Sequence, residues 1–222
     1  MRSFNEKVVW LVERLRKHGI PFAVGGAIAL GYYTRDPRGT RDIDINIFVT
    51  SDTLDLVAAA LSPNVAISDD QRMRILRDDQ VRLRWDDVPV DLFFSSIPLH
   101  SAMLKRINCE SFDGVELPIL SVTDIVICKS IFAREKDWVD IKTVLGHPAL
   151  DKHEVDYWVE DVCGSGSSQL RKWRNVSSKR RAAPEDEMHM PTMRQMHERT
   201  KYSTAHRDGD SVQLGDSAFD DE

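Results

Sequence analysis

The chain has 222 residues, of which 41% are hydrophobic and 30% are charged, and its formal net charge is -6 at pH 7. This composition is that of a soluble globular protein with one good hydrophobic core, large enough for a small second lobe. The negative net charge argues against bulk electrostatic attraction to nucleic acid, although it is compatible with a local basic groove.

Helical and strand patterns alternate through the first half of the chain. Phe4, Val8, Leu11 and Leu15 recur at helical spacing and Gly19 follows them, which predicts an amphipathic first helix. In chain order, the later patterns predict a strand at 21–24, a short helix at 26–33, a strand at 42–49, a helix at 52–61, short strands at 72–76, 81–85 and 88–94, and a hairpin of strands at 109–112 and 115–119.

The pattern changes to helix after residue 120. Ser121 and Asp124 have the spacing of a capping box ahead of an apolar run, and further helices are expected at 137–145 and 152–162. The predicted fold class is therefore α/β (α+β), a mixed sheet with flanking helices followed by a small helical lobe.

Three segments follow from this organisation. We expect a core domain over residues 1–120 and a helical lobe over residues 121–175. Residues 176–222 are polar, mixed in charge and poor in aliphatic side chains, so a flexible or disordered tail is expected there.

Two aspartates interrupt a hydrophobic strand pattern at Asp42 and Asp44. Successive strand residues point to opposite faces, so both carboxylates project from one face, about 6.6 Å apart along the backbone. Two neighbouring carboxylates repel each other unless a positive charge lies between them. A solvent-facing strand edge is the alternative interpretation of the pair.

Asp91 lies in another apolar strand pattern, where an unpaired buried charge is costly. If this strand lies beside the first, Asp42, Asp44 and Asp91 form one carboxylate site for Mg²⁺ or Mn²⁺ that serves phosphate chemistry. Asp42 and Asp44 would bind the metal between nucleotide phosphates. Asp91, a third ligand, would help position or deprotonate an attacking hydroxyl.

A glycine pair and a basic loop precede these carboxylates. Gly25 and Gly26 lie between a strand and a helix, where main-chain N–H groups can face an anion. Arg35 is the preferred phosphate-contacting residue, and Thr40 or Arg41 could assist it. The alternatives are glycines that serve turn geometry alone and a solvated basic loop.

These residues carry a family resemblance over roughly residues 20–145. The first motif resembles the core signature of the nucleotidyltransferase superfamily related to DNA polymerase beta, and more narrowly the GG…R.T.DID pattern of its minimal bacterial, AbiEii-like branch; it comprises Gly25-Gly26, Gly31, Arg35, Thr40 and Asp42-Ile43-Asp44. The segment 128–141 is similar to that branch's second signature, K…A.R.KD..D. The chain departs from the broader superfamily in having Gly-Gly where Gly-Ser is usual.

The second signature implies roles for a charged cluster. Lys129 matches the lysine that contacts triphosphate in the family and is a candidate catalytic residue, while Lys136 is a candidate nucleotide contact. Asp137 and Asp140 end the motif, and Arg134 can share a helix face with Lys129. The alternative is a helix junction in which the two aspartates pair with Arg134 or Lys142.

The resemblance implies a metal-dependent nucleotidyltransferase that moves a nucleoside monophosphate from an NTP to an acceptor hydroxyl and releases pyrophosphate. The AbiEii-like branch further implies the toxin of a toxin–antitoxin pair, a cognate antitoxin, and an acceptor that can be the 3′ end of transfer RNA. One rival is a small-molecule nucleotidyltransferase of the aminoglycoside-modifying kind, which the negative net charge fits slightly better than RNA. The other is a non-catalytic member that binds a nucleotide or a protein partner.

Cysteine usage and the N-terminus bear on location. Cys109, Cys128 and Cys163 are scattered and form no metal-type spacing, which predicts a reduced, cytoplasmic setting. The charged, amphipathic N-terminus resembles neither a signal peptide nor a membrane span, so no membrane association is expected. The histidines lack ligand spacing, and no zinc site is predicted.

Overall fold

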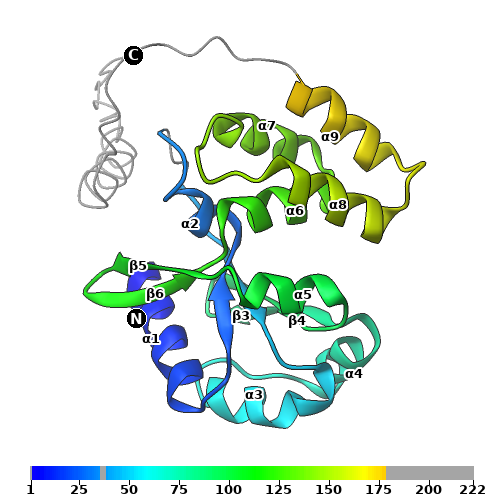
Figure 1. Cartoon of the computed structure of the whole chain (residues 1–222). Helices are drawn as coiled ribbons and strands as arrows, with labels where there is room; N and C mark the ends of the chain where they lie inside the picture. Colours follow the sequence, from blue (N-terminus) through cyan, green and yellow to red (C-terminus); the bar gives the residue numbers. More distant parts are fainter. Residues whose placement is uncertain (1, 36–38, 179–222) are drawn as a thin grey trace, which may run out of the picture. The chain divides into compact units, whose positions relative to one another are not determined.

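The computed structural model describes residues 2–35 and 39–178 (Figure 1). The chain divides into two units, residues 1–186 and 187–222, and the description concerns the first. The predicted tail lies outside the described residues from position 179 onwards, as do residues 36–38 of the basic loop. Within the described ranges, none of the helices combines the length and the apolar character that crossing a membrane requires.

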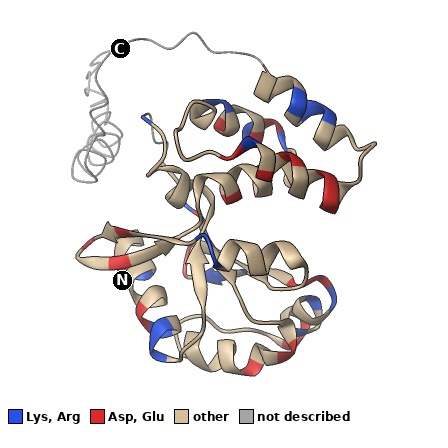
Figure 2. Cartoon of the chain, viewed as in Figure 1, with Lys and Arg blue, Asp and Glu red and all other residues tan. Residues whose placement is uncertain are grey.

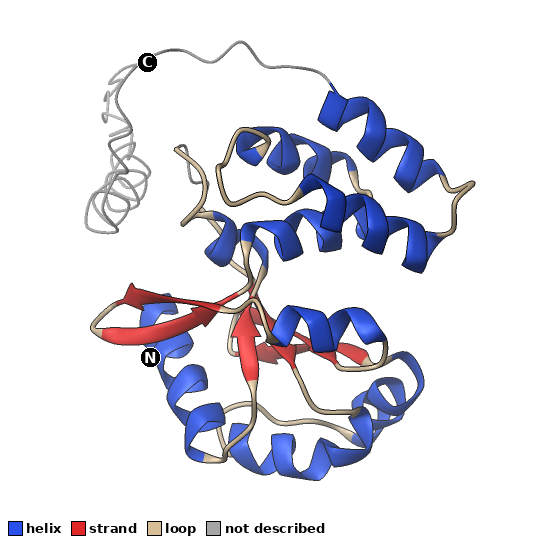
Figure 3. Ribbon diagram, viewed as in Figure 1, coloured by secondary structure: helices blue, strands red, loops and turns tan. Residues whose placement is uncertain are grey.

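A six-stranded mixed sheet has the order β3-β4-β2-β1-β6-β5 (Figure 3). Its central strand β2 runs parallel to β4 and antiparallel to β1, and the hairpins β3–β4 and β5–β6 form the two edges. The fold is therefore the mixed α/β class that the sequence predicts. The strands are β1 (Phe22–Val24), β2 (Ile43–Ile47), β3 (Gln80–Trp85), β4 (Val88–Phe94), β5 (Asn108–Phe112) and β6 (Val115–Ile119).

The helices form two groups. Figures 1 and 3 show α6 to α9 gathered on one side of the sheet, and α1, α3 and α4 on the other. The helices are α1 (Phe4–Lys17), α2 (Gly26–Leu30), α3 (Leu54–Leu61), α4 (Asp69–Asp78), α5 (Pro98–Leu104), α6 (Val122–Phe132), α7 (Glu135–Val144), α8 (Lys152–Cys163) and α9 (Ser168–Ser178), with a short 3₁₀ turn η1 (Ser51–Thr53) before α3.

Alternating apolar residues fix the register of the central strands. Ile43 and Ile45 of β2 and Val90 and Leu92 of β4 are fully buried. Burial of each such side chain stabilises the fold by about 1.5–3 kcal/mol, and a shift of one residue would move all of them to the wrong face. Burial of Ile43 and Ile45 on one face of β2 therefore places Asp44, which lies between them in the sequence, on the opposite face.

One predicted element is wrong. Residues 72–76 were expected to form a strand, but they belong to helix α4. Ser68 caps this helix by accepting a hydrogen bond from the Gln71 N–H at 3.3 Å, while the Gln71 side chain accepts one from the Ser68 N–H at 2.9 Å. This capping box is a helix-start signal, and it outweighs the short strand-like alternation at 72–76. Ile75 is the one buried residue of the helix.

The structure also contains two helices that the sequence patterns did not indicate, α5 and α9. In α9, Leu170, Trp173 and Val176 are buried at helical spacing, so the helix continues past the predicted start of the tail. In Figure 2, ribbon segments of α9 coloured for Lys and Arg lie beside segments of α8 coloured for Asp and Glu. Between these helices, Arg174 pairs with Asp156 at 2.6 Å.

Candidate active site

Three carboxylates meet at one face of the sheet. Strands β2 and β4 lie side by side, as expected, and their register places Asp44 directly beside Asp91. Asp42 immediately precedes β2, one alternation before Asp44, so it emerges on the same side. Two neighbouring strands thereby bring three negative charges together.

The pKa of Asp44 is raised by its burial and by the two neighbouring carboxylates. Burial, the largest cause, and the neighbouring charges of Asp91 and Asp42 together raise the pKa of Asp44 to about 6. Lys129 and Arg134 oppose this shift without cancelling it. A group with such a pKa would gain stability from any cation held beside it.

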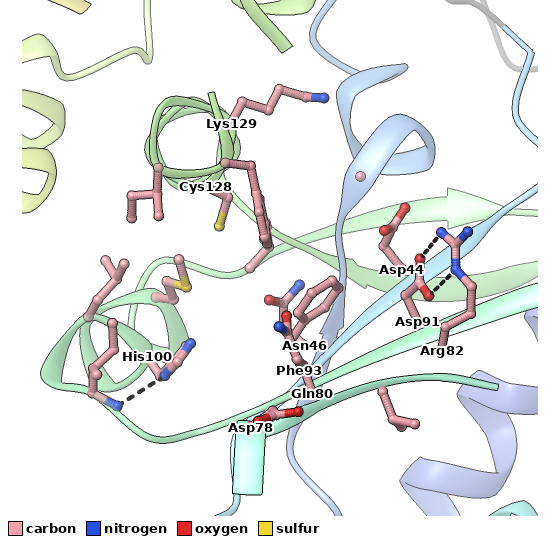
Figure 4. A pocket seen from close by; sticks show the side chains of 18 of the residues that line it. Asp44, Asn46, Asp78, Gln80, Arg82, Asp91, Phe93, His100, Cys128 and Lys129 are labelled. Carbon is pink, nitrogen blue, oxygen red and sulfur yellow. Dashed lines mark hydrogen bonds and ion pairs between the residues drawn. The ribbon is translucent and has the colours of Figure 1, made fainter. Parts of the chain in front are cut away.

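Arg82 supplies a positive charge to this cluster. Its Nε and Nη2 atoms donate to the two carboxylate oxygens of Asp91 at 2.7 and 2.6 Å, in a bidentate pair (Figure 4). The same Nη2 lies 3.4 Å from Oδ2 of Asp42. The sequence interpretation missed Arg82, which reaches the site because the β3–β4 hairpin pairs it with Asp91.

The glycine pair has a packing role at this site. Gly26 has a φ of +56°, and a Cβ there would lie 1.8 Å from Oδ2 of Asp44. A Cβ on Gly25 would lie 2.8 Å from Nδ2 of Asn46, and the Gly25 N–H donates to the Asp44 carbonyl at 2.9 Å. The turn therefore fits against two side chains of β2, and any side chain at residue 26 would overlap Asp44.

A pocket of about 760 Å³ extends from the carboxylates, between the sheet and helix α6. In Figure 4, Asp44, Asp91 and Arg82 lie at one end, His100 lies at the other, and Cys128 and Lys129 come from α6. A cavity of this size suits a nucleotide or another small molecule. Its lining includes Gly26, Asp44, Asn46, Arg74, Asp78, Gln80, Arg82, Asp91, Phe93, Leu99, His100, Met103, Ile125, Cys128, Lys129, Phe132 and Arg134.

Asn46 is a second pocket residue that the sequence interpretation missed. It follows Asp42 and Asp44 in the same alternation and is 7% exposed, and its side-chain amide makes no hydrogen bond to another described residue. It lies beside Phe93 in the strand register, and the ring of Phe93 lies 5.9 Å from that of Phe132. The alternation that identified the aspartates could have identified this amide too.

His100 closes the far end of the pocket. Its Nδ1 accepts hydrogen bonds from the main-chain N–H groups of Ser96 and Ile97 at 3.0 and 3.3 Å. Burial lowers the pKa of His100, so the ring is neutral at pH 7 and carries its proton on Nε2. His100 therefore caps the start of α5, and its ring also lines the pocket.

The second motif forms an ion-pair network. Lys129 is 6% exposed, and its Nζ lies 2.7 Å from Asp140 and 3.5 Å from Asp137. Arg134 pairs with Asp137 at 2.7 Å across the start of α7. The alternative of a helix junction is thus present in part, because Arg134 pairs with Asp137 as expected but the lysine in the network is Lys129 and not Lys142. Lys129 therefore lines the pocket while its charge is already paired with two aspartates. Its contact with a triphosphate stays a prediction.

Replacement of Lys129 with Met is expected to lower the free energy of unfolding by about 3–5 kcal/mol, because it leaves a buried carboxylate without its cation. Chemical denaturation measures this loss. The matched control is Lys136→Met, because Lys136 is exposed on the adjacent helix and its loss should cost less than about 0.5 kcal/mol. A Lys129→Met variant as stable as the parent would show that the lysine has no structural role.

The remaining predicted nucleotide contacts lie outside the pocket lining as described. Thr40 accepts a hydrogen bond from the Asp42 N–H at 3.2 Å and so shapes the entry to β2. Arg35, Arg41 and Lys136 are exposed. Their roles in binding phosphate stay predictions.

The carboxylate cluster fits a divalent cation by its chemistry. Within residues 2–35 and 39–178, no group of three or more His, Cys, Asp or Glu side chains is already arranged to hold a metal ion. The donor set, however, consists of hard carboxylate oxygens, which Mg²⁺ and Mn²⁺ prefer. Both oxygens of Asp91, however, accept hydrogen bonds from Arg82. The three carboxylates are therefore present, but that of Asp91 is paired with an arginine.

Comparison with known proteins identifies the fold. The chain resembles the solution structure of the antibiotic-resistance factor ANT(2'')-Ia with a TM-score of 0.50 and 12% identity, over 72% of this chain and 92% of that one. It resembles the crystal structure of ANT(2'')-Ia in complex with adenylyl-2''-tobramycin with a TM-score of 0.51 and 11% identity, over 71% of this chain and 95% of that one. The chain has a nucleotidyltransferase-like fold. No protein-family model matches it, and no curated protein matches its sequence.

Proposed function

We propose that the protein is a metal-dependent nucleotidyltransferase that transfers a nucleoside monophosphate from an NTP to an acceptor hydroxyl. The observation that carries this proposal is the placement of Asp44 and Asp91 side by side at one end of a pocket. Asp42 lies on the same face of the sheet. The nucleotidyltransferase-like fold supports it. Of the two motifs that resemble this superfamily, the first lies on the sheet and the second on helices α6 and α7, from which Lys129 and Arg134 line the same pocket.

The proposed transfer forms one bond to the α-phosphorus of the NTP and breaks another. The acceptor oxygen forms a bond to the α-phosphorus, the bond from that phosphorus to the bridging oxygen breaks, and pyrophosphate leaves. Asp42, Asp44 and Asp91 would hold Mg²⁺ or Mn²⁺, and the bound metal would stabilise the charge on the phosphate oxygens. Asp91 would position the acceptor hydroxyl or accept its proton.

A small molecule with a free hydroxyl is the acceptor class that we favour. The pocket of about 760 Å³ has polar groups at both ends and apolar walls, which is typical of small-ligand sites. The adenylyl-tobramycin complex of the structurally similar ANT(2'')-Ia is consistent with this class. The second candidate is the 3′ end of transfer RNA in a toxin paired with an antitoxin, which the two AbiEii-like motifs favour.

The experiment that tests the function uses each α-³²P-labelled NTP with Mg²⁺ or Mn²⁺ and the purified protein. One series receives a panel of amino sugars and a cellular small-molecule extract, and the other receives total RNA. We expect label in the small-molecule series, together with release of pyrophosphate. Label in the RNA alone would replace the favoured acceptor by the second candidate, and no label in any series would contradict the proposed function.

Replacement of Asn46 with Leu is expected to raise the KM for one substrate by about ten-fold or more, because a buried amide that contacts substrate is worth about 1–3 kcal/mol. The free energy of unfolding should change little, since the side chains are similar in size and the amide has no hydrogen bond within the described residues to lose. Initial-rate kinetics and thermal unfolding measure the two effects. An unchanged KM for both substrates would show that Asn46 makes no substrate contact.

A further inference from the structure

Arg82 holds both oxygens of a carboxylate that the proposed metal site requires. Its bidentate pair with Asp91 measures 2.7 and 2.6 Å, and the contact to Asp42 measures 3.4 Å. A carboxylate whose two oxygens both accept hydrogen bonds from a guanidinium is poorly placed to offer either one to a metal ion. The structure therefore contains the ligands of a cation site with a protein cation among them.

We propose that Arg82 occupies the cation position of the carboxylate cluster in the metal-free protein, and that a divalent metal ion binds by displacing its guanidinium from Asp91. This inference rests on the proposed function, because it assigns the metal to the same three aspartates. It makes Arg82 a positioning residue that sets metal affinity.

The surroundings of Arg82 permit this exchange. Its side chain is 58% exposed, whereas the side chain of Asp91 is 13% exposed. The guanidinium therefore approaches the cluster from the solvent side and can leave without disturbing the core. Asp91, in contrast, is fixed on a central strand and stays beside Asp44. The movable partner of the pair is the arginine.

The charges in the cluster favour the exchange. Three carboxylates face one guanidinium, so the cluster keeps a negative excess when Arg82 is bound. A divalent ion replaces one positive charge by two at the same place. Removal of Arg82 should therefore strengthen metal binding, because the remaining carboxylates lose a competitor. A residue that merely oriented Asp91 for the metal would have the opposite effect when removed.

The test measures Mn²⁺ binding to the whole protein by electron paramagnetic resonance, without nucleotide or acceptor. We expect Arg82→Gln to bind Mn²⁺ about ten-fold more tightly than the parent, from the loss of one nearby positive charge in a partly solvated site. Arg82→Lys should lie between the two, since it keeps the charge without the bidentate geometry. Asp44→Asn should lose the binding and thereby assign it to this cluster.

The matched control is Arg84→Gln. Arg84 lies two residues along β3 on the same exposed face and donates to the Asp87 carbonyl at 3.3 Å, so its removal changes the net charge equally without touching the cluster. Its Mn²⁺ affinity should equal that of the parent. An equal gain in Mn²⁺ affinity in Arg82→Gln and Arg84→Gln would show that net charge alone causes the effect, and it would overturn the inference.

The remaining outcomes are separable. Equal or weaker Mn²⁺ binding by Arg82→Gln, with clear binding by the parent, would overturn the inference and leave the proposed metal site intact. Absence of binding in both proteins would overturn the inference and the metal site together. A second measurement needs no variant: the ¹⁵N resonance of the Arg82 Nε–H should shift when Mg²⁺ is added to the parent, and an unchanged resonance at saturating Mg²⁺ would contradict displacement.

Discussion

Replacement of Asp44 with Asn is expected to abolish nucleotidyl transfer and, at the same time, to stabilise the metal-free protein at neutral pH. Asp44 is the central carboxylate of the cluster and lines the pocket. Loss of a residue that only hydrogen-bonds to a metal ligand already lowers metal affinity or activity by about 10–100-fold. Loss of a direct ligand should lower activity more. Activity measured as label transfer should therefore fall by more than about 100-fold.

The gain in stability follows from the direction of the Asp44 pKa shift. Its pKa is about 6 in the folded protein and near 3.8 in the unfolded chain. Below pH 3.8 both states are protonated and the group contributes nothing. As the pH rises from 3.8 to 6, the unfolded chain releases its proton first, so stability falls. Above pH 6 the full penalty is present, and it amounts to about 3 kcal/mol.

Denaturation curves from pH 4 to pH 8, recorded without divalent metal, measure this effect. The parent should lose stability between pH 4 and 6 relative to Asp44→Asn, and the difference should be constant above pH 7. The control is Asp113→Asn, because Asp113 is exposed in the β5–β6 turn, where Asn tolerates its φ of +49°. Parallel curves for the parent and Asp44→Asn would contradict the raised pKa of Asp44.

Replacement of Gly26 with Ala should have the second largest effect. The new Cβ would lie 1.8 Å from Oδ2 of Asp44, so the carboxylate has to leave its position beside Asp91. The backbone φ of +56° costs a further 1–3 kcal/mol or so for a residue with a side chain. We expect unfolding free energy to fall by at least about 2 kcal/mol and transfer activity to fall by about 100-fold or more.

A double-mutant cycle separates the two causes. In an Asp44→Ala background the overlaps with Oδ2 and Cγ disappear and only the Cβ of residue 44 remains close, at 3.0 Å. Gly26→Ala should then cost little more than the backbone strain of about 1–3 kcal/mol. The matched control is Gly114→Ala in the β5–β6 turn, where φ is +87° and a Cβ would meet no atom within 4 Å. A Gly26→Ala cost that is the same in both backgrounds would contradict the contact with Asp44.

The candidate site divides into parts that the sequence could and could not predict. Asp42 and Asp44 were predictable because strand alternation places them on one face. Asp91 was predictable because an unpaired charge is costly in an apolar strand. Arg82 required the hairpin register: counting outwards from the turn at residues 86–87 pairs it with Asp91. Position alone gave no sign of it, because an arginine on an exposed strand face is ordinary.

The fold shows the same division. The strands and the long helices were predictable because their apolar spacing is regular, whereas α4 has few buried residues and an alternation that imitates a strand. Lys129 illustrates a further limit of local reasoning. Its partners Asp137 and Asp140 lie on the next helix, so only the packing of α6 against α7 shows that its charge is matched.

The most direct test of nucleotidyl transfer compares two labels on the same NTP. Parent protein and Asp44→Asn are incubated with acceptor and either α-³²P or γ-³²P NTP, and the labelled products are separated. For the parent, the α label should appear on the acceptor and the γ label in pyrophosphate, while Asp44→Asn should give neither. Transfer of the γ label to the acceptor, or equal α labelling by both proteins, would contradict nucleotidyl transfer at the Asp42, Asp44 and Asp91 cluster.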